Sequence, residues 1–497
     1  MKITKVVLSM LFLCRLLFAE EDPEKRGILS SMKESYFILP QEVDTLSDMF
    51  TEGLFYGRVR FNSFGFKWKD ELNVGDRSVR KDHAIAAIGG SVIYKSAYLN
   101  GFAFTLAGYT TQSRGSLSSD EAYLYKAGKG LLSRYDYITK DKQGISTIAQ
   151  AYLEFHNEKS YIKAGRLIFE SFLTASNDTK MIPNTFEGAT LETTYIPDTL
   201  LKAAFLTKQK LRDHSEFHEV LAIADFVSND PFHKFSENDD SAVHFGLKKS
   251  KLDALGIKDR LMIIDARNHS IENLTLRMNY TALPDLVSSA MIQADYEMNF
   301  LDIDVKPAFR YMHQFDNGAG AIGGANLKTL TSRYSDPDSL DSWLLAARVD
   351  IDNHVWKLRF GYTQIADKGD LVAPWRGFPT AGFSRAMAQY NWYANTKSYM
   401  IRADLDLDTA GLIPGVQAFM RYAIQDFDDD KPGTQADSNV VTLDVLKEFT
   451  AYPGLYMKFR MAHVAGDNDT VAFVNGEPKT KLDPSYGEAR FEINYLF

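Results

Sequence analysis

The sequence predicts an all-β protein, a transmembrane antiparallel β-barrel of 18 strands. Three observations predict it: segments of about ten residues in which apolar and polar side chains alternate, connections that are alternately short and long, and an aromatic strand at the end of the chain. After the first 19 residues there is no apolar run of about 18 residues, the length that a transmembrane helix needs. Membrane-spanning strands give no such run, because only alternate side chains face lipid.

The last segment of the chain shows the alternation most clearly. Its apolar face is formed by Phe491, Ile493, Tyr495 and Phe497, and polar side chains occupy the positions between them. An exposed aromatic strand would pair with other chains, and closure against the first strand removes that edge. A terminal phenylalanine is also typical of proteins that outer-membrane insertion machinery recognises. We therefore expect Phe497 to be the contact with that machinery.

Connections support the same fold, because short links with turn residues alternate with long polar stretches such as 112 to 146, 168 to 186 and 209 to 258. The short links would be periplasmic and the long ones outside. In 209 to 300 a strand at 242 to 249 could replace or join 259–267, so counts of 16 and 20 stay open. The predicted strands are 55–66, 84–95, 101–111, 147–156, 160–167, 187–196, 200–208, 259–267, 274–283, 288–298, 303–314, 341–351, 354–365, 397–407, 415–426, 440–448, 454–465 and 486–497.

The first 54 residues do not belong to the predicted barrel, which covers 55–497. Residues 1–19 have the basic start, apolar centre and terminal Ala19 of a secretory signal peptide. Residues 20–54 form a short N-terminal periplasmic segment, in which Val43 to Phe50 predict a helix before Gly53. Cleavage after Ala19 removes the single cysteine, so disulfides are excluded, and leaves 53 basic against 65 acidic residues, a net charge of −12. Such an acidic exported chain is not expected to bind nucleic acid.

The water-facing positions of the predicted strands carry many cations, which we interpret as a basic ladder along one wall of a pore. A charge on the lipid face costs about 2–4 kcal/mol at the membrane midplane, so the lumen is the favoured place for these side chains. Alternatively they only solvate the interior or pair with Asp304, Asp350, Asp404 and Asp406. The cations are Arg277, Lys306, Arg310, Arg348, Lys357, Arg359, Arg402, Arg421, Lys458 and Arg460.

Patterns that could indicate an enzyme, a cofactor or a metal have simpler interpretations. Gly318 to Gly323 fits the dinucleotide pattern G-x-G-x-x-G, but no amphipathic helix follows, so an outer loop is favoured. His214 and His218, and the aspartates at 426, 428 and 430, read as solvated loop tips rather than metal ligands. No catalytic arrangement of serine or histidine is present. The sequence predicts no catalytic residue, cofactor or metal, and its expected partners are membrane lipid and small solutes.

One stretch resembles a known family. Lys163-Ala164-Gly165-Arg166, followed by Ala175-Ser176-Asn177-Asp178-Thr179-Lys180-Met181-Ile182-Pro183-Asn184-Thr185-Phe186-Glu187-Gly188-Ala189-Thr190-Leu191, is similar to the OprD family of outer-membrane porins. Lys208 to Asp213 resembles the family's next loop, and the match covers about fifty residues. The resemblance implies an 18-stranded barrel with an inward-folded third outer loop, a basic ladder, and passage of small carboxylate-bearing molecules.

The resemblance also places three residues in the loop that narrows the pore. Asp178, Lys180 and Pro183 belong to it, and Asp178 and Lys180 either line the constriction or fix the loop to the wall. Thr179-Lys180 stands where the family often has Ser-Arg, which keeps a charge but loses the guanidinium fork. The predicted function is a passive channel with a preference for carboxylates, acting as a monomer or a homotrimer. An unspecific diffusion porin and an adhesin or structural barrel are the alternatives.

Overall fold

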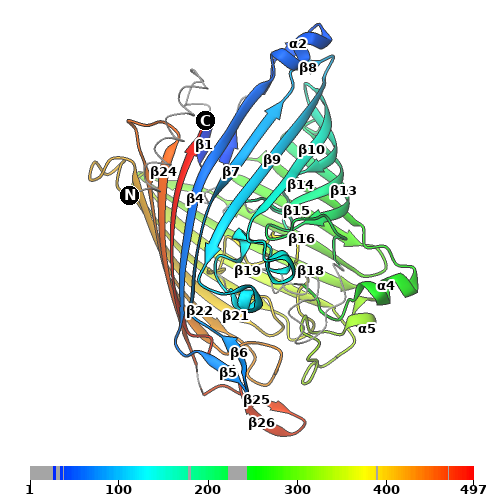
Figure 1. Cartoon of the computed structure of the whole chain (residues 1–497), viewed down its shortest axis with the longest axis vertical. Coiled ribbons are helices and arrows are strands. Elements are labelled where there is room, and N and C mark those ends of the chain that lie inside the picture. Colours follow the sequence, from blue (N-terminus) through cyan, green and yellow to red (C-terminus); the bar gives the residue numbers. More distant parts are fainter. Residues whose placement is uncertain are drawn as a thin grey trace.

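The computed structural model describes residues 26–28, 34–36, 39–176, 181–221, 243–387, 390–467 and 469–497. Within these residues, 18 long antiparallel strands close into a barrel, as the alternation predicts (Figure 1). They are β4 (Leu54–Trp68), β7 (His83–Lys95), β9 (Phe102–Gly115), β10 (Ile145–Asn157), β11 (Ser160–Leu167), β12 (Thr185–Thr193), β13 (Thr199–Lys210), β14 (Leu261–Ile271), β15 (Leu274–Leu283), β16 (Val287–Tyr296), β18 (Ile303–Asp316), β19 (Ser342–Asp352), β20 (Trp356–Ile365), β21 (Lys397–Asp406), β22 (Val416–Asp426), β23 (Ser438–Glu448), β24 (Leu455–Gly466) and β27 (Tyr486–Leu496).

Shorter elements extend the barrel wall or lie in the connections. Helix α2 confirms the helix predicted before Gly53, and its cap is Thr45, whose side chain accepts a hydrogen bond from Asp48 N. The short elements are β1 (Arg26–Ile28), β2 (Glu34–Tyr36), β3 (Glu42–Val43), α2 (Leu46–Thr51), β5 (Leu72–Val74), β6 (Arg77–Arg80), β8 (Tyr98–Leu99), η2 (Ser119–Leu124), η3 (Lys129–Leu131), α3 (Arg134–Lys140), α4 (Lys249–Leu255), β17 (Met298–Phe300), α5 (Ala319–Gly323), β25 (Val471–Val474) and β26 (Glu477–Thr480).

Alternation of the side chains separates an apolar outer face from a polar inner face. In β21, Tyr399 and Ile401 are exposed on the outside of the barrel, whereas Met400 between them is buried. The same outward face continues through neighbouring strands at Phe360 and Tyr422, which pair with these residues in register. An exposed apolar belt of this kind suits lipid, and the inner face holds the charged residues.

The barrel closes between its first and last long strands, as the terminal aromatic strand predicts. Strand β27 pairs antiparallel with β4 from Tyr486 opposite Trp68 to Leu496 opposite Arg58. The backbone of Phe497 adds two hydrogen bonds to Gly57, at 2.9 and 3.1 Å. Figure 1 shows the two strands side by side, one at each end of the colour scale.

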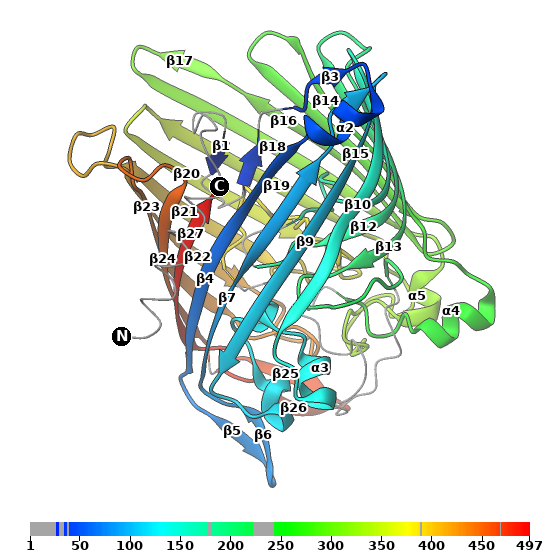
Figure 2. The ribbon, with the colours of Figure 1, turned by 45° about the horizontal axis from the view of Figure 1, so that its top comes forward.

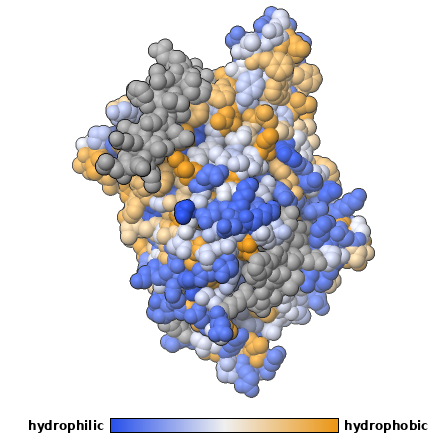
Figure 3. Space-filling model, in the orientation of Figure 1, coloured by the Kyte–Doolittle hydropathy of each residue, from blue (hydrophilic) through white to orange (hydrophobic). Residues whose placement is uncertain are grey.

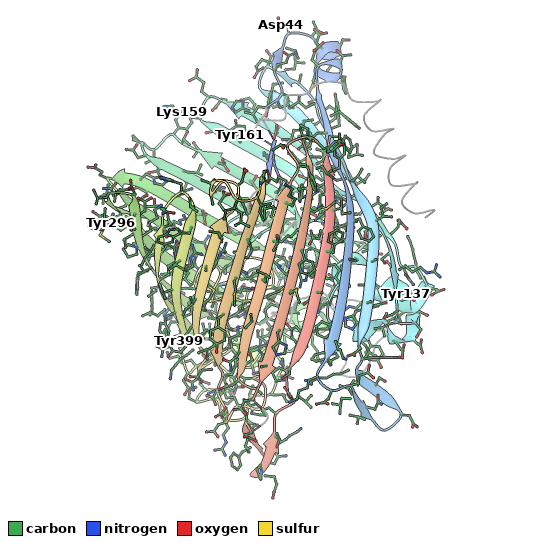
Figure 4. All side chains as sticks on the ribbon, turned by 90° about the vertical axis from the view of Figure 1, so that its left-hand side faces the viewer. Asp44, Tyr137, Lys159, Tyr161, Tyr296 and Tyr399 are labelled. Atoms are coloured by element: carbon green, nitrogen blue, oxygen red, sulfur yellow. The ribbon has the colours of Figure 1, made fainter. Side chains whose placement is uncertain are left out.

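Short and long connections lie at opposite ends of the barrel. The figures place α2 and β8 at one end, and the hairpins β5–β6 and β25–β26 at the other (Figures 1 and 2). Figure 4 shows Asp44, before α2, and Lys159, in the turn between β10 and β11, at the same end. By the rule that turns are short on the periplasmic side, this end is periplasmic. One connection departs from the predicted alternation, because residues 284–286 at the loop end are also short.

The differences from the sequence prediction are local. Where 242 to 249 offered an alternative strand, residues 243–248 form turns and α4 follows. Strand β20 begins at Trp356 rather than at residue 354, because the side chain of Asn353 accepts hydrogen bonds from the Val355 and Trp356 amides and makes a turn. Within the described residues, no helix has the length and apolar character needed to cross a membrane. The signal peptide predicted at 1–19 lies outside the described residues.

Candidate pore lining

The inner wall carries its predicted cations in successive rows across neighbouring strands. Arg359, Arg402 and Arg421 stand side by side on β20, β21 and β22, in direct register. Two positions nearer the periplasmic end, a second row carries Lys357 on β20 and, four strands further, Arg460 on β24. Rows two residues apart are separated by about 7 Å along a strand. The cations therefore descend the wall in steps.

Most of these cations are paired with carboxylates, which agrees with the alternative that the sequence left open. Arg359 forms two hydrogen bonds of 2.6 Å with Asp350, and Arg402 holds Asp404 at 2.8 Å. Arg460 pairs with Asp444, and Lys458 lies 3.6 Å from the same carboxylate. Lys306 contacts Asp304, Glu297 and Asp352 at 3.1 to 3.3 Å, and Arg277 lies 3.4 Å from Asp295.

Two ladder cations have neither a carboxylate nor another hydrogen-bonding partner for their side chains in the described part of the chain. Among the described residues, the side chains of Arg421 and Lys357 form no hydrogen bond and no ion pair. The Arg421 guanidinium lies over the Phe419 ring, 4.9 Å from its centre, and Arg402 lies over the same ring at 4.3 Å. Phe419 thus holds two guanidinium groups next to each other. Arg421 is half-buried, so it keeps contact with the water of the lumen.

The ladder cations nearest the outer loops form hydrogen bonds with one of these loops. Loop L7 (366–396) sends residues 379–384 against the inner wall. Arg310 donates to Pro379 O at 2.6 Å and Ala381 O at 3.1 Å, and it also donates to Gln293 Oε1 at 2.8 Å. Rings of Phe172 and Phe383 lie over the Arg310 guanidinium at 4.9 and 4.5 Å. Arg310, predicted as a solute contact, is therefore occupied by protein groups.

Arg348 and Arg359 hold the same segment of L7. Both donate to Gly382 O at 3.1 Å, and Arg348 also binds Asp295 at 2.8 Å. The loop touches the wall at Gly361, where a Cβ atom would lie 2.1 Å from Phe383 O. Only glycine permits this approach of loop and strand. Because all three arginines are on the inner face, L7 lies inside the barrel.

The third outer loop, L3 (168–184), packs against L7. Ala175 N donates to Trp375 O at 3.1 Å, Gly377 N donates to Leu173 O at 3.0 Å, and Thr174 and Arg376 form an isolated β-bridge. Pro183 is buried, and its carbonyl accepts a hydrogen bond from Lys210 Nζ at 3.3 Å. The predicted constriction residues Asp178 and Lys180 lie outside the described residues.

Further along L3, Met181 and Ile182 are fully buried. They share one apolar cluster with Met400, Ala423 and other inward-facing residues of β21 to β24. Those strand residues occupy the row next to the three arginines on its outer side. Apolar wall and loops therefore lie directly above the arginine row.

A cavity of about 200 Å³ lies on the periplasmic side of that row. Trp356, Lys357, Phe419, Asp404 and Lys458 are among its lining residues. The free ammonium of Lys357 and the ring that supports Arg421 both face it.

The histidines of loop L4 (211–260) are not solvated, which corrects the sequence interpretation. His214 and His218 are buried, and their Nδ1 and Nε2 atoms lie 2.8 Å apart. His218 Nδ1 donates to Glu219 O at 2.7 Å. Burial lowers the pKa of His214 to about 3 and that of His218 to about 4, against the opposing charge of Asp213. No group of three or more potential metal ligands occurs among the described residues.

This pair makes the stability of L4 depend on pH. Both histidines bind protons more weakly in the folded loop than at their ordinary pKa of 6.5. The neutral, buried histidines therefore stabilise the folded loop fully above pH 6.5. This stabilisation is lost as the pH falls toward the folded pKa values of about 3 and 4. We expect amides 211–221 to exchange hydrogen faster at about pH 4.5 than at about pH 7, after correction for intrinsic rates.

The matched control for the pH effect is His269, an exposed histidine near the periplasmic end of β14. His214→Asn with His218→Gln should abolish the pH dependence of exchange, whereas His269→Asn should leave it intact. Equal protection of 211–221 at both pH values in the unmodified protein would contradict the assignment.

Family membership follows from a comparison of the sequence with family models. A model of the OprD family, described as outer membrane porin, matches residues 126–442, which is more than half of the chain. The chain belongs to the OprD family of outer membrane porins. It is therefore a porin of the outer membrane, a passive diffusion channel formed by a closed barrel.

Solved structures of OprD-type porins share the fold. Pseudomonas aeruginosa OpdK, crystallised with vanillate, is 13% identical with a TM-score of 0.65, and the match covers 90% of this chain and 99% of that one. Acinetobacter baumannii OccAB3 is 17% identical with a TM-score of 0.64, covering 89% and 99%. Pseudomonas aeruginosa OpdQ is 17% identical with a TM-score of 0.61, covering 89% and 98%. A search of curated protein sequences gave no significant match.

Proposed function

We propose that this OprD-family porin prefers small carboxylate-bearing solutes, and that Arg421 is the principal contact for the carboxylate. The observation that carries the proposal is a half-buried guanidinium that has no hydrogen bond or ion pair among the described residues and lies beside Arg402 in the row below the loops. A guanidinium fork binds a carboxylate through two parallel hydrogen bonds. Phe419 restricts the side chain, so little conformational entropy is lost on binding.

Lys357 and Arg402 offer the next contacts along the path. Because Asp404 already binds Arg402, a solute carboxylate would compete for it and be held weakly. Weak, successive sites favour permeation, since a solute must leave each site as readily as it enters. The residues proposed for this path are Arg402, Arg421, Lys357 and Arg460, with Arg310, Arg348 and Arg359 acting through L7.

The acidic composition of the chain does not oppose this selectivity. Charges further away than a Debye length of about 8 Å are largely screened at physiological salt. A solute at the narrow section therefore responds to the wall beside it, where Arg421 and Lys357 are unpaired. The aspartates 428 to 430 lie in an outer loop and act only at a distance.

The narrow section itself is part of the proposal. We place L3 inside the barrel together with L7, with Asp178 and Lys180 at its inner edge. The burial of Met181 and Ile182 against inward-facing residues of β21 to β24 supports this path. Residues 20–54 are assigned to the periplasmic side, Phe497 to recognition by the insertion machinery, and the assembly to a monomer or a homotrimer.

Replacing Arg402 and Arg421 with glutamine tests the proposed preference. Losing two charge-assisted hydrogen bonds worth about 1.5–3 kcal/mol each should slow carboxylate entry by about a hundredfold or more. Neutral sugars of the same size should be slowed much less, because glutamine keeps most of the volume. Liposome swelling measures both rates, and bilayer recording under a salt gradient should show reduced anion selectivity.

The matched control removes the same number of cations from the opposite wall. Lys163 and Lys202 are inward-facing on β11 and β13 and are paired with Glu154 and Glu192, at 3.7 and 3.4 Å. Lys163→Gln with Lys202→Gln should leave the ratio of carboxylate to sugar uptake nearly unchanged. If the Arg402 and Arg421 double variant slowed both solutes equally, the barrel would be an unspecific sieve.

A further inference from the structure

On the outward face of four neighbouring strands, β11 to β14, apolar side chains give way to cations at the loop end. Ile162, Phe205 and Met262 are exposed on this lipid-facing surface. Nearer the outer loops the same surface carries Arg166 and Lys208, and Arg260 immediately precedes β14. The charges point away from the lumen, so they do not serve the pore.

These cations are linked to one another across the strands. Arg166 and Lys208 both contact Glu187, at 2.9 and 3.7 Å. The Arg260 guanidinium donates to Thr207 O at 3.3 Å, which places it next to Lys208. Two positive charges therefore share one carboxylate, and a third lies beside them.

Helix α4 continues the charged surface. The segment 246–260 contains Lys248, Lys249, Lys251, Lys258 and Arg260 against only two aspartates, in a chain with a net charge of −9. Lys249 pairs with Glu219 at 3.3 Å, two residues after Phe217, whose ring lies 4.6 Å from the Arg166 guanidinium. Figures 1 and 2 show α4 projecting from the side of the barrel, and Figure 3 shows hydrophilic residues gathered on that side.

We define the basic band as Arg166, Lys208, Lys248, Lys249, Lys258 and Arg260. Several of its cations can still form hydrogen bonds or ion pairs with an external group. Among the described residues, Lys248 and Lys258 have no hydrogen bond or ion pair, and Arg260 contacts only backbone carbonyls. The side chains of Arg166, Lys208 and Lys249 are 43%, 51% and 39% exposed. The band can therefore accept an external anion.

We propose that the basic band binds the phosphate groups of lipid A, the phosphorylated glycolipid of the outer leaflet. Its height on the barrel supports this occupant. Strand β13 is tilted, so the segment from Thr199 to Lys208 covers a height of about 23 Å across the membrane. This height is close to that of the apolar layer that such a barrel crosses, about 25 Å. The band therefore lies at the level of the outer-leaflet phosphates. Arginine and lysine together suit phosphate, through forked hydrogen bonds and point charge.

The test compares phosphorylated and dephosphorylated lipid A on the full-length barrel purified in detergent. Retention of each lipid is measured by native mass spectrometry. The unmodified protein should retain the phosphorylated form preferentially. Lys208→Gln, Lys258→Gln and Arg260→Gln together should weaken retention on the order of a hundredfold, from about 1 kcal/mol for each cation at a lipid surface.

A matched control removes three exposed cations elsewhere on the outer loops, by Lys142→Gln, Lys368→Gln and Lys479→Gln. It should retain lipid A as the unmodified protein does. Equal retention of the dephosphorylated lipid, or an unchanged triple variant of the band, would overturn the proposal. Release of the lipid by millimolar inorganic phosphate would also overturn it, by indicating a site for free phosphate.

Folding is controlled separately. Heat-modifiable migration on gels and unchanged pore conductance identify variants that keep the barrel. If the triple variant fails to fold, the single variant Lys258→Gln, at an exposed position, should still reduce retention severalfold. Unchanged retention in that folded variant would count against the band.

Discussion

Replacing Arg310 with methionine should release loop L7 from the wall and open the pore. Arg310 is buried and donates three hydrogen bonds, two of them to backbone carbonyls of L7 located 69 and 71 residues further along the chain. Methionine fills similar space but donates nothing. Buried acceptors that lose a charged donor cost about 1–3 kcal/mol each. We expect the local stability of L7 to fall by about 3 kcal/mol.

The consequence should be visible in single channels. A loss of about 3 kcal/mol raises the population of the opened loop by about a hundredfold. Single-channel conductance and its noise should therefore both increase, and the amides 379–384 should exchange hydrogen faster. Selectivity for carboxylates should change less than in the Arg402 and Arg421 variant, because the free guanidinium is retained.

Arg277 provides the matched control for this prediction. It is also an inward-facing ladder arginine, and it lies 3.4 Å from Asp295. Among the described residues it makes no hydrogen bond to L7. Arg277→Met should leave the exchange of 379–384 unchanged. Increased conductance in both variants, or in neither, would show that Arg310 does not hold the loop.

The contrast between Arg310 and Arg421 shows where sequence reasoning stops. Both are arginines at inward positions of predicted strands, and the alternation assigns them the same role. Their partners differ because carbonyls of L7 accept hydrogen bonds from Arg310 on β18, whereas no hydrogen bond of the Arg421 side chain on β22 occurs among the described residues. Those partners are backbone carbonyls, which carry no side-chain signature in the sequence. The sequence therefore predicted the wall and the charges on it, but not which charges remain available.

Strands were predictable for a related reason. The two faces of each barrel strand meet different solvents, lipid and water, so the period of two is imposed along its whole length. Loops have no such constraint. Helix α4 and the burial of His214 and His218 depend on packing between loops. The sequence predicted only a long loop there, with an alternative strand at 242 to 249 and a solvated tip at the histidines. Phe419 and Phe383, which support the arginines, had no distinguishing signal beyond being aromatic residues.

The pairing of β27 with β4, which we call the seam, closes the barrel and gives the second large prediction. We expect Gly57→Val to prevent this closure. A Cβ atom at Gly57 would lie 2.3 Å from Ser91 O on β7 and 2.7 Å from the Phe497 ring. The ring of Phe497 covers this glycine, an aromatic contact that compensates for the missing side chain in a strand. Valine must displace both the neighbouring strand and the terminal residue. Overpacking usually costs about 1–3 kcal/mol, and a backbone atom cannot move aside as a side chain does.

A second glycine on the same strand makes the test specific. Gly65 lies on the same face of β4, and a Cβ atom there would have no neighbour within 4 Å. Gly65→Val should be neutral or slightly stabilising, because valine favours strands. We expect refolding into detergent to give several times less heat-modifiable barrel for Gly57→Val than for Gly65→Val. Phe497→Ala should fall between them, because it removes the covering ring but leaves its two backbone hydrogen bonds to Gly57. Equal yields for the two glycine variants would mean that the pairing of β27 with β4 tolerates distortion at Gly57, and that closure is determined by the rest of the seam.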